Sequence, residues 1–462
     1  MTYHPTTFRG LTWCDSLDRM ANGETTPREY LESCLEIIAA REPVVQALTA
    51  IDEDGSRARA DASTRRWKDG RALSAIDGMP IGIKDLLETA TMPTEMGCAA
   101  FRGNFPRRDN AAVRALRAAG AIILAKTVTA ELGGSHPGPT TNPHDASRSP
   151  GGSSSGSAAA VAAGMMPTAI GTQVAGSIIR PAAYCGNVAI KPSKGAINRG
   201  ERQATSMSVH GVHANGLEDM WRVAIEIAKR AGGDPGHAGL SGPDHLPEPV
   251  RPNRLVVLHG AGWDALDPGT RSAFDAVCAG LKDIGVEMTG AGNDPRVDEL
   301  EQLLVDSMET CNLITGWENH WLYRNLVDQD PDSVSPRARE VLARAEALTP
   351  ADYRDALQRR AAAQQAGAAV LADADAIVML SCPGPAHVWQ GDRPGEPLTE
   401  RPTGDPVFNA PSSYLFAPAV TMPLLAVDGL PVGVQVMGPP ESDARVTALA
   451  RWIMGNLSPI SI

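Results

Sequence analysis

The sequence predicts an α/β protein in which helices cover a β-sheet. Apolar runs of strand length alternate with amphipathic runs of helix length along most of the chain. Apolar residues make up 43% and charged residues 21% of the 462 residues, as expected for a soluble globular protein. This length exceeds an ordinary single core, so we expect either two subdomains or one large α/β domain.

Charge and cysteine usage exclude several classes of protein. The formal net charge of −12 argues against nucleic acid or an anionic membrane as the main partner. The seven cysteines are scattered without a CxxC pair, which predicts a reducing compartment, no disulfide framework and no zinc site. The first twenty residues are too polar for a signal peptide, and no apolar run reaches the roughly 20 residues that span a bilayer. We therefore expect a cytoplasmic protein.

The first elements are a docked helical segment and a strand that ends on a lysine. Thr26 and Pro27 have the pattern of a helix start, and we expect residues 1–70 to dock on the core. Residues 75–85 (AIDGMPIGIKD) predict a turn and a short apolar strand ending at Lys84. An ammonium group at that place must be paired or neutralised, because it is costly to bury.

The rest of the chain is organised around residues 148–193. Before them, Asp109 is expected to cap a helix that leads into a strand at 121–125. Within them lie two Gly/Ser clusters, separated by a small-residue helix at 157–164 and a core strand at 166–170. The predicted unit is therefore loop, helix, strand and loop, with serines on both loops.

The second half repeats the alternation of strands and helices. A helix over 217–230 precedes a Gly- and Pro-rich surface loop at 232–252. Residues 383–411 are predicted to form a loop over the site, with Trp389 as a candidate lid residue. The remaining predicted strands are 254–258, 376–380 and 433–437, and the remaining helices are 268–284, 297–326, 350–372 and 443–454.

Three residues in this pattern point to acyl transfer. Ser177 is the candidate nucleophile, because the backbone N–H groups of Val174, Ala175, Gly176 and Ser177 lie where an oxyanion would develop. A serine hydroxyl needs a base, and a buried lysine held neutral can serve. Lys84 meets that requirement. Ser153 could relay the proton, and a cis peptide at Gly152-Ser153 would aim its side chain toward both groups.

Several separated motifs in this sequence resemble those of the amidase signature family. They are GIKD at 82–85, AGAIILAKT at 119–127, TTNP at 140–143, PGGSSSGSAAAVAAG at 150–164, GTQVAGSIIRPAAYCG at 171–186, IKPS at 190–193 and LPVGVQVMG at 430–438. The similarity covers residues 25–455, and the motifs occur in the family's order.

The resemblance implies a fold, a triad and a domain organisation. It implies Ser177 as nucleophile, Ser153 as bridging serine and Lys84 as base, without any metal or organic cofactor. It also implies one mixed β-sheet with helices on both faces. On this basis residues 1–462 are expected to form a single amidase domain. The signature core would occupy 71–235, and residues 254–462 would complete the sheet and the substrate pocket.

Two departures from the family pattern bear on the substrate. Most of the family has an acid where this chain has Gln173, and the arginine lies one place later here, at Arg180. This swap resembles the malonamidase-like branch, in which the shifted arginine binds a substrate carboxylate; a structural ion pair is the alternative for Arg180. Ser154 is a further candidate for substrate contact, although a capping or loop-bonding role fits it as well.

The leading functional hypothesis is an amide hydrolase. It would cleave a primary amide or anilide to a carboxylic acid plus ammonia or an amine, through a seryl acyl-enzyme. The expected partner is a small-molecule amide, and a homodimer is plausible. One alternative is an amidotransferase subunit that releases ammonia for a partner. Another is a non-catalytic binding protein on the same fold.

Overall fold

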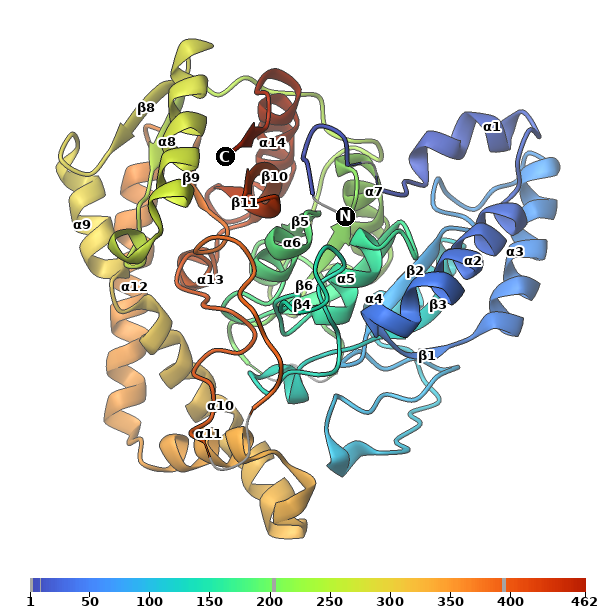
Figure 1. Ribbon diagram of the computed structural model, residues 1–462, viewed down its shortest axis with the longest axis horizontal. Helices are drawn as coiled ribbons and strands as arrows, with labels where there is room; N and C mark the ends of the chain where they lie inside the picture. The colour runs from blue at the N-terminus through green and yellow to red at the C-terminus, as the bar shows by residue number, and fades with distance from the viewer. Residues whose placement is uncertain (1–2, 9, 202–204, 393–395) are drawn as a thin grey trace.

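The computed structural model (Figure 1) describes residues 3–8, 10–201, 205–392 and 396–462, and it contains one mixed β-sheet. Its strands are β1 (Leu48–Ile51), β2 (Pro80–Lys84), β3 (Ile122–Thr127), β4 (Thr168–Gln173), β5 (Val188–Lys191), β6 (Val209–Ala214), β7 (Arg254–Val257), β8 (Glu287–Gly290), β9 (Ala376–Leu380), β10 (Ala419–Val427), β11 (Leu430–Met437) and β12 (Ile460–Ser461). The predicted α/β class with a single mixed sheet is confirmed.

Helices fill most of the connections between these strands. They are α1 (Leu17–Ala21), α2 (Pro27–Val45), α3 (Glu53–Lys68), α4 (Ala111–Ala118), α5 (Ser155–Ala162), α6 (Ile179–Cys185), α7 (Leu217–Ala231), α8 (Pro268–Asp283), α9 (Pro295–Leu304), α10 (Ser307–Gln329), α11 (Pro336–Glu346), α12 (Pro350–Leu371), α13 (Ala410–Tyr414) and α14 (Asp443–Asn456). None of the helices in the described ranges is long and apolar enough to cross a membrane.

The strand order is β1-β3-β2-β4-β6-β5-β10-β11-β9-β7-β8, with β12 beside β10. Strand β2 is parallel to both β3 and β4, and β7 is parallel to both β8 and β9. The two halves of the chain meet where β5 pairs antiparallel with β10, Ile190 lying opposite Val420. Strands that precede the surface loop at 232–252 and strands that follow it therefore belong to the same sheet.

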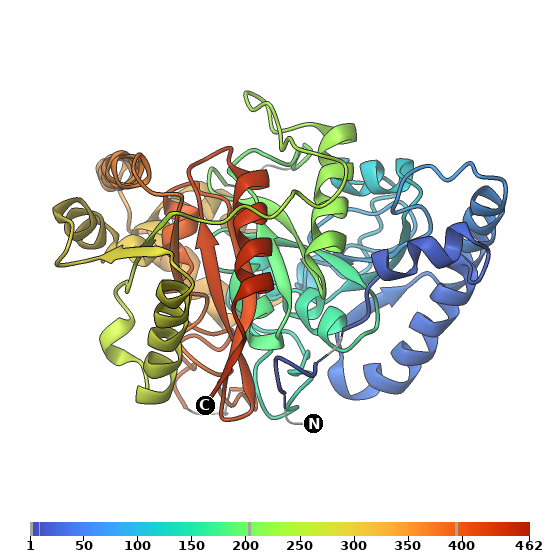
Figure 2. The same ribbon diagram turned by 90° about the horizontal axis from the view of Figure 1, so that it is seen from above.

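Helices cover both faces of the sheet (Figure 2). Helices α5 and α6 pack on the central strands from one side, while α4, α7 and α14 form the layer on the other side. Every residue of α5 is buried. A Cβ at Gly156 would lie 2.2 Å from the carbonyl oxygen of Ala47, so only glycine allows this close approach. This packing explains why the stretch is so rich in Gly, Ala and Ser.

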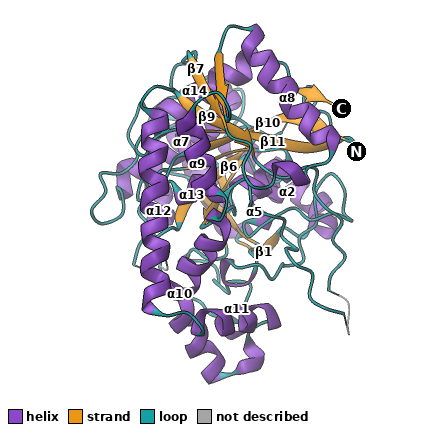
Figure 3. Cartoon of the chain, turned by 90° about the vertical axis from the view of Figure 1, so that its left-hand side faces the viewer, coloured by secondary structure: helices purple, strands orange, loops and turns teal. Residues whose placement is uncertain are grey.

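A helical lobe extends the second half of the protein. Helices α10 and α11 lie at the lower end of the molecule in Figure 1, and Figure 3 shows α10 beside the long α12. The sequence pattern at 297–326 predicted one long helix, but the structure has two, α9 and α10. Helix α11 was not predicted.

Most predicted helix starts are confirmed, with one correction. Thr26 accepts a hydrogen bond from the Glu29 N–H at the start of α2. Helix α4 is capped by Asn110 and not by Asp109 as predicted. Asp109 instead accepts hydrogen bonds from the Ala90 N–H and from Arg117. Either side chain could cap a helix, so the neighbouring loop decides between them.

Candidate active site

Lys84 is the last residue of β2 and is completely buried. Its Nζ lies 2.8 Å from Ser153 Oγ, 2.9 Å from Ser154 Oγ and 2.9 Å from Thr172 Oγ1. Among the described residues no carboxylate forms an ion pair with it. Lys126, at the neighbouring strand β3, is equally buried but pairs with Asp85 at 2.7 Å. Lys126 therefore has a carboxylate partner for its charge, whereas Lys84 has none among the described residues.

The environment of Lys84 favours the neutral amine. Burial holds the pKa of Lys84 well below its usual value, and the positive charge of Arg180 lowers it further. A neutral amine keeps a lone pair and can accept a proton from a hydroxyl at hydrogen-bond distance. Lys84 therefore lies at hydrogen-bond distance from Ser153, and its lowered pKa favours the form that can accept a proton.

The predicted relay Ser153 lies between Lys84 and the second serine loop. The Gly152–Ser153 peptide bond is cis, as predicted from the glycine-rich loop. Ser153 is 2% exposed, and its carbonyl accepts a hydrogen bond of 3.0 Å from the Ala130 N–H. Ser154, a candidate for substrate contact, is fully buried, and its hydroxyl bonds Lys84 and the backbone of Thr172. These bonds place the Ser154 hydroxyl between Lys84 and β4.

Ser177 lies on the loop between β4 and α6 and is partly exposed. Its carbonyl accepts from the Ser154 N–H at 3.3 Å, which brings the two serine loops into contact. Within the described residues, the Ser177 and Ser153 hydroxyls are not hydrogen bonded to each other.

The backbone N–H groups predicted to form the oxyanion hole are available. Across the described residues, no hydrogen bond uses the N–H of Val174, Ala175, Gly176 or Ser177. The loop's carbonyls do take part in bonds, because the oxygen of Gly176 accepts from the Arg180 N–H. Free donors on a loop held by other bonds suit the stabilisation of a developing negative charge.

Gln173 holds this loop in shape. Its side-chain oxygen accepts from the N–H groups of Ile178 and Ile179 at 2.8 and 3.0 Å, at the start of α6. Its side-chain nitrogen donates to the carbonyl of Ala175 at 3.3 Å and to the hydroxyl of Ser413 at 3.2 Å. An amide can satisfy both sets of partners because it carries both a donor and an acceptor. Gln173 therefore replaces the acid of the common pattern without leaving a buried charge.

Arg180 is buried beside the same loop. Its Nε donates to the carbonyl of Thr403 at 2.9 Å, and its Nη2 donates to the carbonyl of Gly152 at 2.6 Å. Its Nη1 faces Gly176, where an added Cβ would lie 2.3 Å away, and is 3.5 Å from Asn409 Oδ1. Among the described residues it forms no ion pair, so the structural alternative considered for Arg180 lacks a carboxylate partner.

Several residues of this site were not predicted from the sequence. Thr172 contributes both its hydroxyl and its carbonyl to Lys84, and its place one residue before Gln173 was an available clue. Thr403 and Asn409 contact Arg180 from the late Pro/Gly segment, far away in the chain. Only the folded structure could reveal those two.

Two buried histidines of β6 lie near the site. His213 faces Gly171, where an added Cβ would lie 2.7 Å from its Nε2 and 2.9 Å from Ser154 Oγ. Burial lowers the pKa of His213 to about 3 and that of His210 to about 4. Both imidazoles are therefore neutral at physiological pH.

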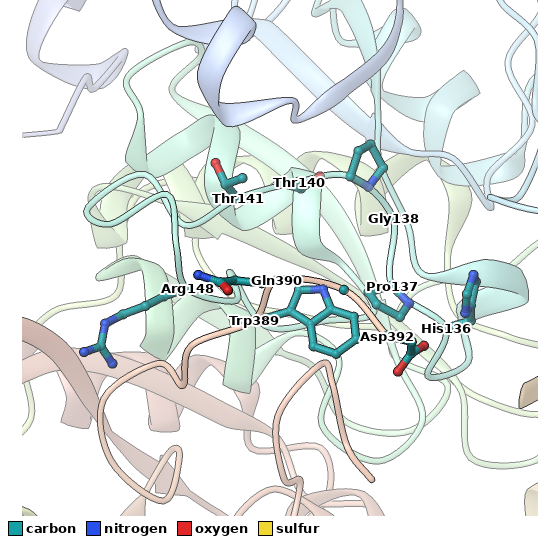
Figure 4. A pocket seen from close by; sticks show the side chains of 11 residues that line it. His136, Pro137, Gly138, Thr140, Thr141, Arg148, Trp389, Gln390 and Asp392 are labelled. Atoms are coloured by element: carbon teal, nitrogen blue, oxygen red, sulfur yellow. The ribbon is translucent and has the colours of Figure 1, made fainter. Parts of the chain in front are cut away.

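A pocket of about 600 Å³ separates the loop at 136–141 from the segment that carries Trp389 (Figure 4). The indole of Trp389 lies across this pocket, and His136, Asp392 and Arg148 also line it. Asp392 is tied to Arg337 of α11. The residues lining this pocket do not include the predicted triad, so Trp389 lines a different cavity.

Comparison with known proteins places the chain in a family. The Amidase family model matches residues 29–447. A glutamyl-tRNA(Gln) amidotransferase subunit of Symbiobacterium thermophilum is 33% identical over 460 residues, covering 93% of each chain. The corresponding protein of Chloroflexus aggregans is 30% identical over 454 residues, covering 92% of each.

Solved structures agree with this placement. A protein described as an amidase superposes with a TM-score of 0.82 at 29% identity, covering 97% of this chain and 100% of that one. The native peptide amidase of Stenotrophomonas maltophilia gives a TM-score of 0.77 at 26% identity, covering 98% and 99%. The length matched and the shared fold lead to one conclusion: the chain belongs to the amidase signature family.

Proposed function

We propose that the protein hydrolyses a carboxylic acid amide through a seryl acyl-enzyme on Ser177. The observation that carries this proposal is Lys84, a fully buried lysine without an ion-pair partner among the described residues, within 2.8 Å of Ser153. A lysine in that setting is poised as a neutral base. Free backbone donors beside Ser177 supply the second requirement, stabilisation of an oxyanion.

In acylation, the Ser177 oxygen attacks the amide carbonyl carbon while its proton passes to Ser153. Ser153 gives its own proton to Nζ of Lys84, which becomes an ammonium. The carbonyl π electrons move to oxygen, and the N–H groups of residues 174–177 stabilise that charge. The proton then returns through Ser153 to the leaving nitrogen. The carbon–nitrogen bond breaks, and ammonia or an amine departs.

In deacylation, water takes the place of the leaving amine. Its proton passes through Ser153 to Lys84 as its oxygen attacks the acyl carbon. The returning proton restores the Ser177 hydroxyl when the ester bond breaks, and the carboxylic acid leaves. Protons and electrons balance over the cycle, and Lys84 ends as the neutral amine.

The test compares single serine variants on one amide substrate and with a serine-directed fluorophosphonate. Ser177→Ala is expected to lower kcat at least about 10³-fold and to abolish covalent labelling, because the nucleophile is gone. Ser153→Ala should lower kcat but retain slow labelling. Ser155→Ala is the matched control, since among the described residues the Ser155 hydroxyl bonds only the carbonyl of Val128. Normal turnover by Ser177→Ala would refute the proposal.

A second candidate function is that of an amidotransferase subunit. It is supported by the curated relatives, which are named as subunits of a glutamyl-tRNA(Gln) amidotransferase and match at 30% and 33% identity over nearly the full chain. Gln173 and the shifted Arg180 argue for a free-standing hydrolase. The discriminating measurement is ammonia release from glutamine and from simple amides by the chain purified alone. Activity that requires added partner proteins would favour the amidotransferase role.

We further propose that Arg180 selects amides that carry a carboxylate. In support, its guanidinium faces the Ser177 loop at Gly176 and bonds carbonyl and amide oxygens, with no ion pair to a described carboxylate. Its planar group suits carboxylate binding. An Arg180→Ala variant assayed on neutral and acidic amides tests this role. A loss confined to acidic amides supports charge recognition, and equal losses on both refute it.

A further inference from the structure

The turn at 130–134 borders the hydroxyl of the proposed relay Ser153. The Ala130 N–H donates to the carbonyl of Ser153 at 3.0 Å. A Cβ added at Gly133 would lie 3.8 Å from Ser153 Oγ, so the turn's backbone forms one wall beside that hydroxyl. Any displacement of this turn therefore changes the surroundings of Ser153.

The backbone of this turn needs support from elsewhere. Leu132 has a φ of 52° and Gly133 a φ of 75°, and the left-handed region is unfavourable for a branched residue such as leucine. Such a conformation persists only where the surroundings impose it. Part of that constraint is local, because the Leu132 N–H donates to the carbonyl of Met96 at 2.8 Å.

The rest of the support comes from helices α10 and α11, residues 307–346, which we call the α10–α11 lobe. The carboxylate of Glu131 accepts from the Ser335 N–H at 2.9 Å and from the Ser335 hydroxyl, at the first turn of α11. Leu132 packs against an apolar cluster in the lobe that includes Tyr323 and Leu326. The lobe thus holds the turn through both a polar and an apolar contact.

Of these two contacts, the hydrogen bonds between Glu131 and Ser335 are expected to contribute more to holding the turn in place. Glu131 is 6% exposed, and among the described residues no cation forms an ion pair with it. Its charge is therefore stabilised by hydrogen bonds, and charge-assisted bonds of this kind are stronger than neutral ones. Ser335 is also the capping residue of α11, since its hydroxyl accepts from the Ala338 N–H. One serine thus fixes both the helix start and the turn.

We propose that Glu131 is a positioning residue, through which the α10–α11 lobe holds the turn at 130–134 against Ser153 in the geometry that proton relay requires. The inference rests on the proposed function. It makes turnover depend on Glu131 and on the α10–α11 lobe, which is far from the triad in the chain.

The test uses the full chain and measures kcat, KM, the rate of fluorophosphonate labelling and the melting temperature. Glu131→Ala is expected to lower kcat by about 10- to 100-fold, because small misplacements of reacting groups are costly. KM should change less than about threefold. Glu131→Gln should restore most of kcat, since its amide oxygen can still accept from the Ser335 N–H.

Glu301→Ala is the matched control. The Glu301 carboxylate also accepts two hydrogen bonds, in its case from the backbone N–H groups of His259 and Gly260, in a segment with no hydrogen bond to the triad among the described residues. It should lower the melting temperature without a comparable loss of kcat. If Glu131→Ala does not fold, Ser335→Ala, which removes one of the two bonds, should lower kcat about 2- to 5-fold.

Three results would overturn the inference. They are a Glu131→Ala enzyme with unchanged kcat, a Gln variant no better than the Ala variant, and a Ser335→Ala enzyme with unchanged kcat where the Ala variant does not fold. Ser153→Ala separates this failure from failure of the proposed function. An impaired Ser153→Ala enzyme beside a normal Glu131→Ala enzyme refutes only the positioning role, whereas normal turnover by Ser153→Ala refutes the relay itself.

Discussion

Replacing Lys84 with methionine removes the proposed base and keeps a buried side chain of similar length. Nζ of Lys84 lies within 2.9 Å of three hydroxyls, those of Ser153, Ser154 and Thr172. General-base catalysis contributes about 10²–10⁴ in rate, so kcat should fall by that factor, which raises the activation free energy by about 3–5 kcal/mol. No ion pair with a described residue is broken. The loss of neutral hydrogen bonds should therefore lower the free energy of unfolding by only about 1–3 kcal/mol.

The assay measures kcat on a chromogenic anilide and the free energy of unfolding in urea, for Lys84→Met and for a control. Lys191→Met is the control, because Lys191 is also buried and its Nζ donates to the carbonyl of Pro192 at 2.9 Å, outside the site. The control should lose stability but keep kcat. A Lys84→Met enzyme that retains more than about a tenth of the wild-type kcat would show that Lys84 is not the base.

Three further predictions concern charge around the site. Arg180→Gln removes a positive charge that lowers the pKa of Lys84, so that pKa should rise and the acidic limb of kcat/KM on a neutral amide should move to higher pH; an unmoved limb contradicts it. Gln173→Glu places an oxygen against the carbonyl of Ala175 and adds negative charge near Lys84, so kcat at pH 7 should fall at least about tenfold and the same limb should rise; a wild-type profile would refute this. His213 has its pKa lowered to about 3, so the unfolded chain binds its proton first, and the free energy of unfolding should fall by about 1.4 kcal/mol per pH unit below about pH 6.5. His213→Gln should remove that part of the loss in urea melts at pH 7 and pH 5, and an equal loss in both proteins would contradict the assignment.

The predictable part of the fold is what local sequence determines. The turn and strand ending at Lys84, the strand Ala376–Leu380 and the start of α12 at Pro350 were all predicted correctly. The split between α9 and α10 was not predicted, because an apolar period can continue across a break in the backbone. Strand β10 was not recognised, although its apolar run matches its burial between β5 and β11.

In the candidate site too, residues within one sequence motif could be predicted, whereas residues brought together only by the fold could not. Residues that lie within one motif, such as Ser153 and Ser177, could be singled out because the Gly/Ser pattern carries its own geometry. The partners of Arg180 could not, since Thr403 and Asn409 reach it from a segment more than two hundred residues away in sequence. Glu131 carries no local pattern, and its contact with Ser335 depends on how the α10–α11 lobe docks.

The pairing of β5 with β10 makes the site a property of both halves of the chain. Residues before the loop at 232–252 supply Lys84 and both serines. The later half supplies hydrogen-bond acceptors that hold the Ser177 loop: the Ser413 hydroxyl accepts from Gln173, and the Thr403 carbonyl accepts from Arg180. A chain cut within that loop should therefore behave as a split enzyme. Each fragment alone is expected to lack amidase activity, and activity should return only when the co-expressed fragments pair again through β5 and β10.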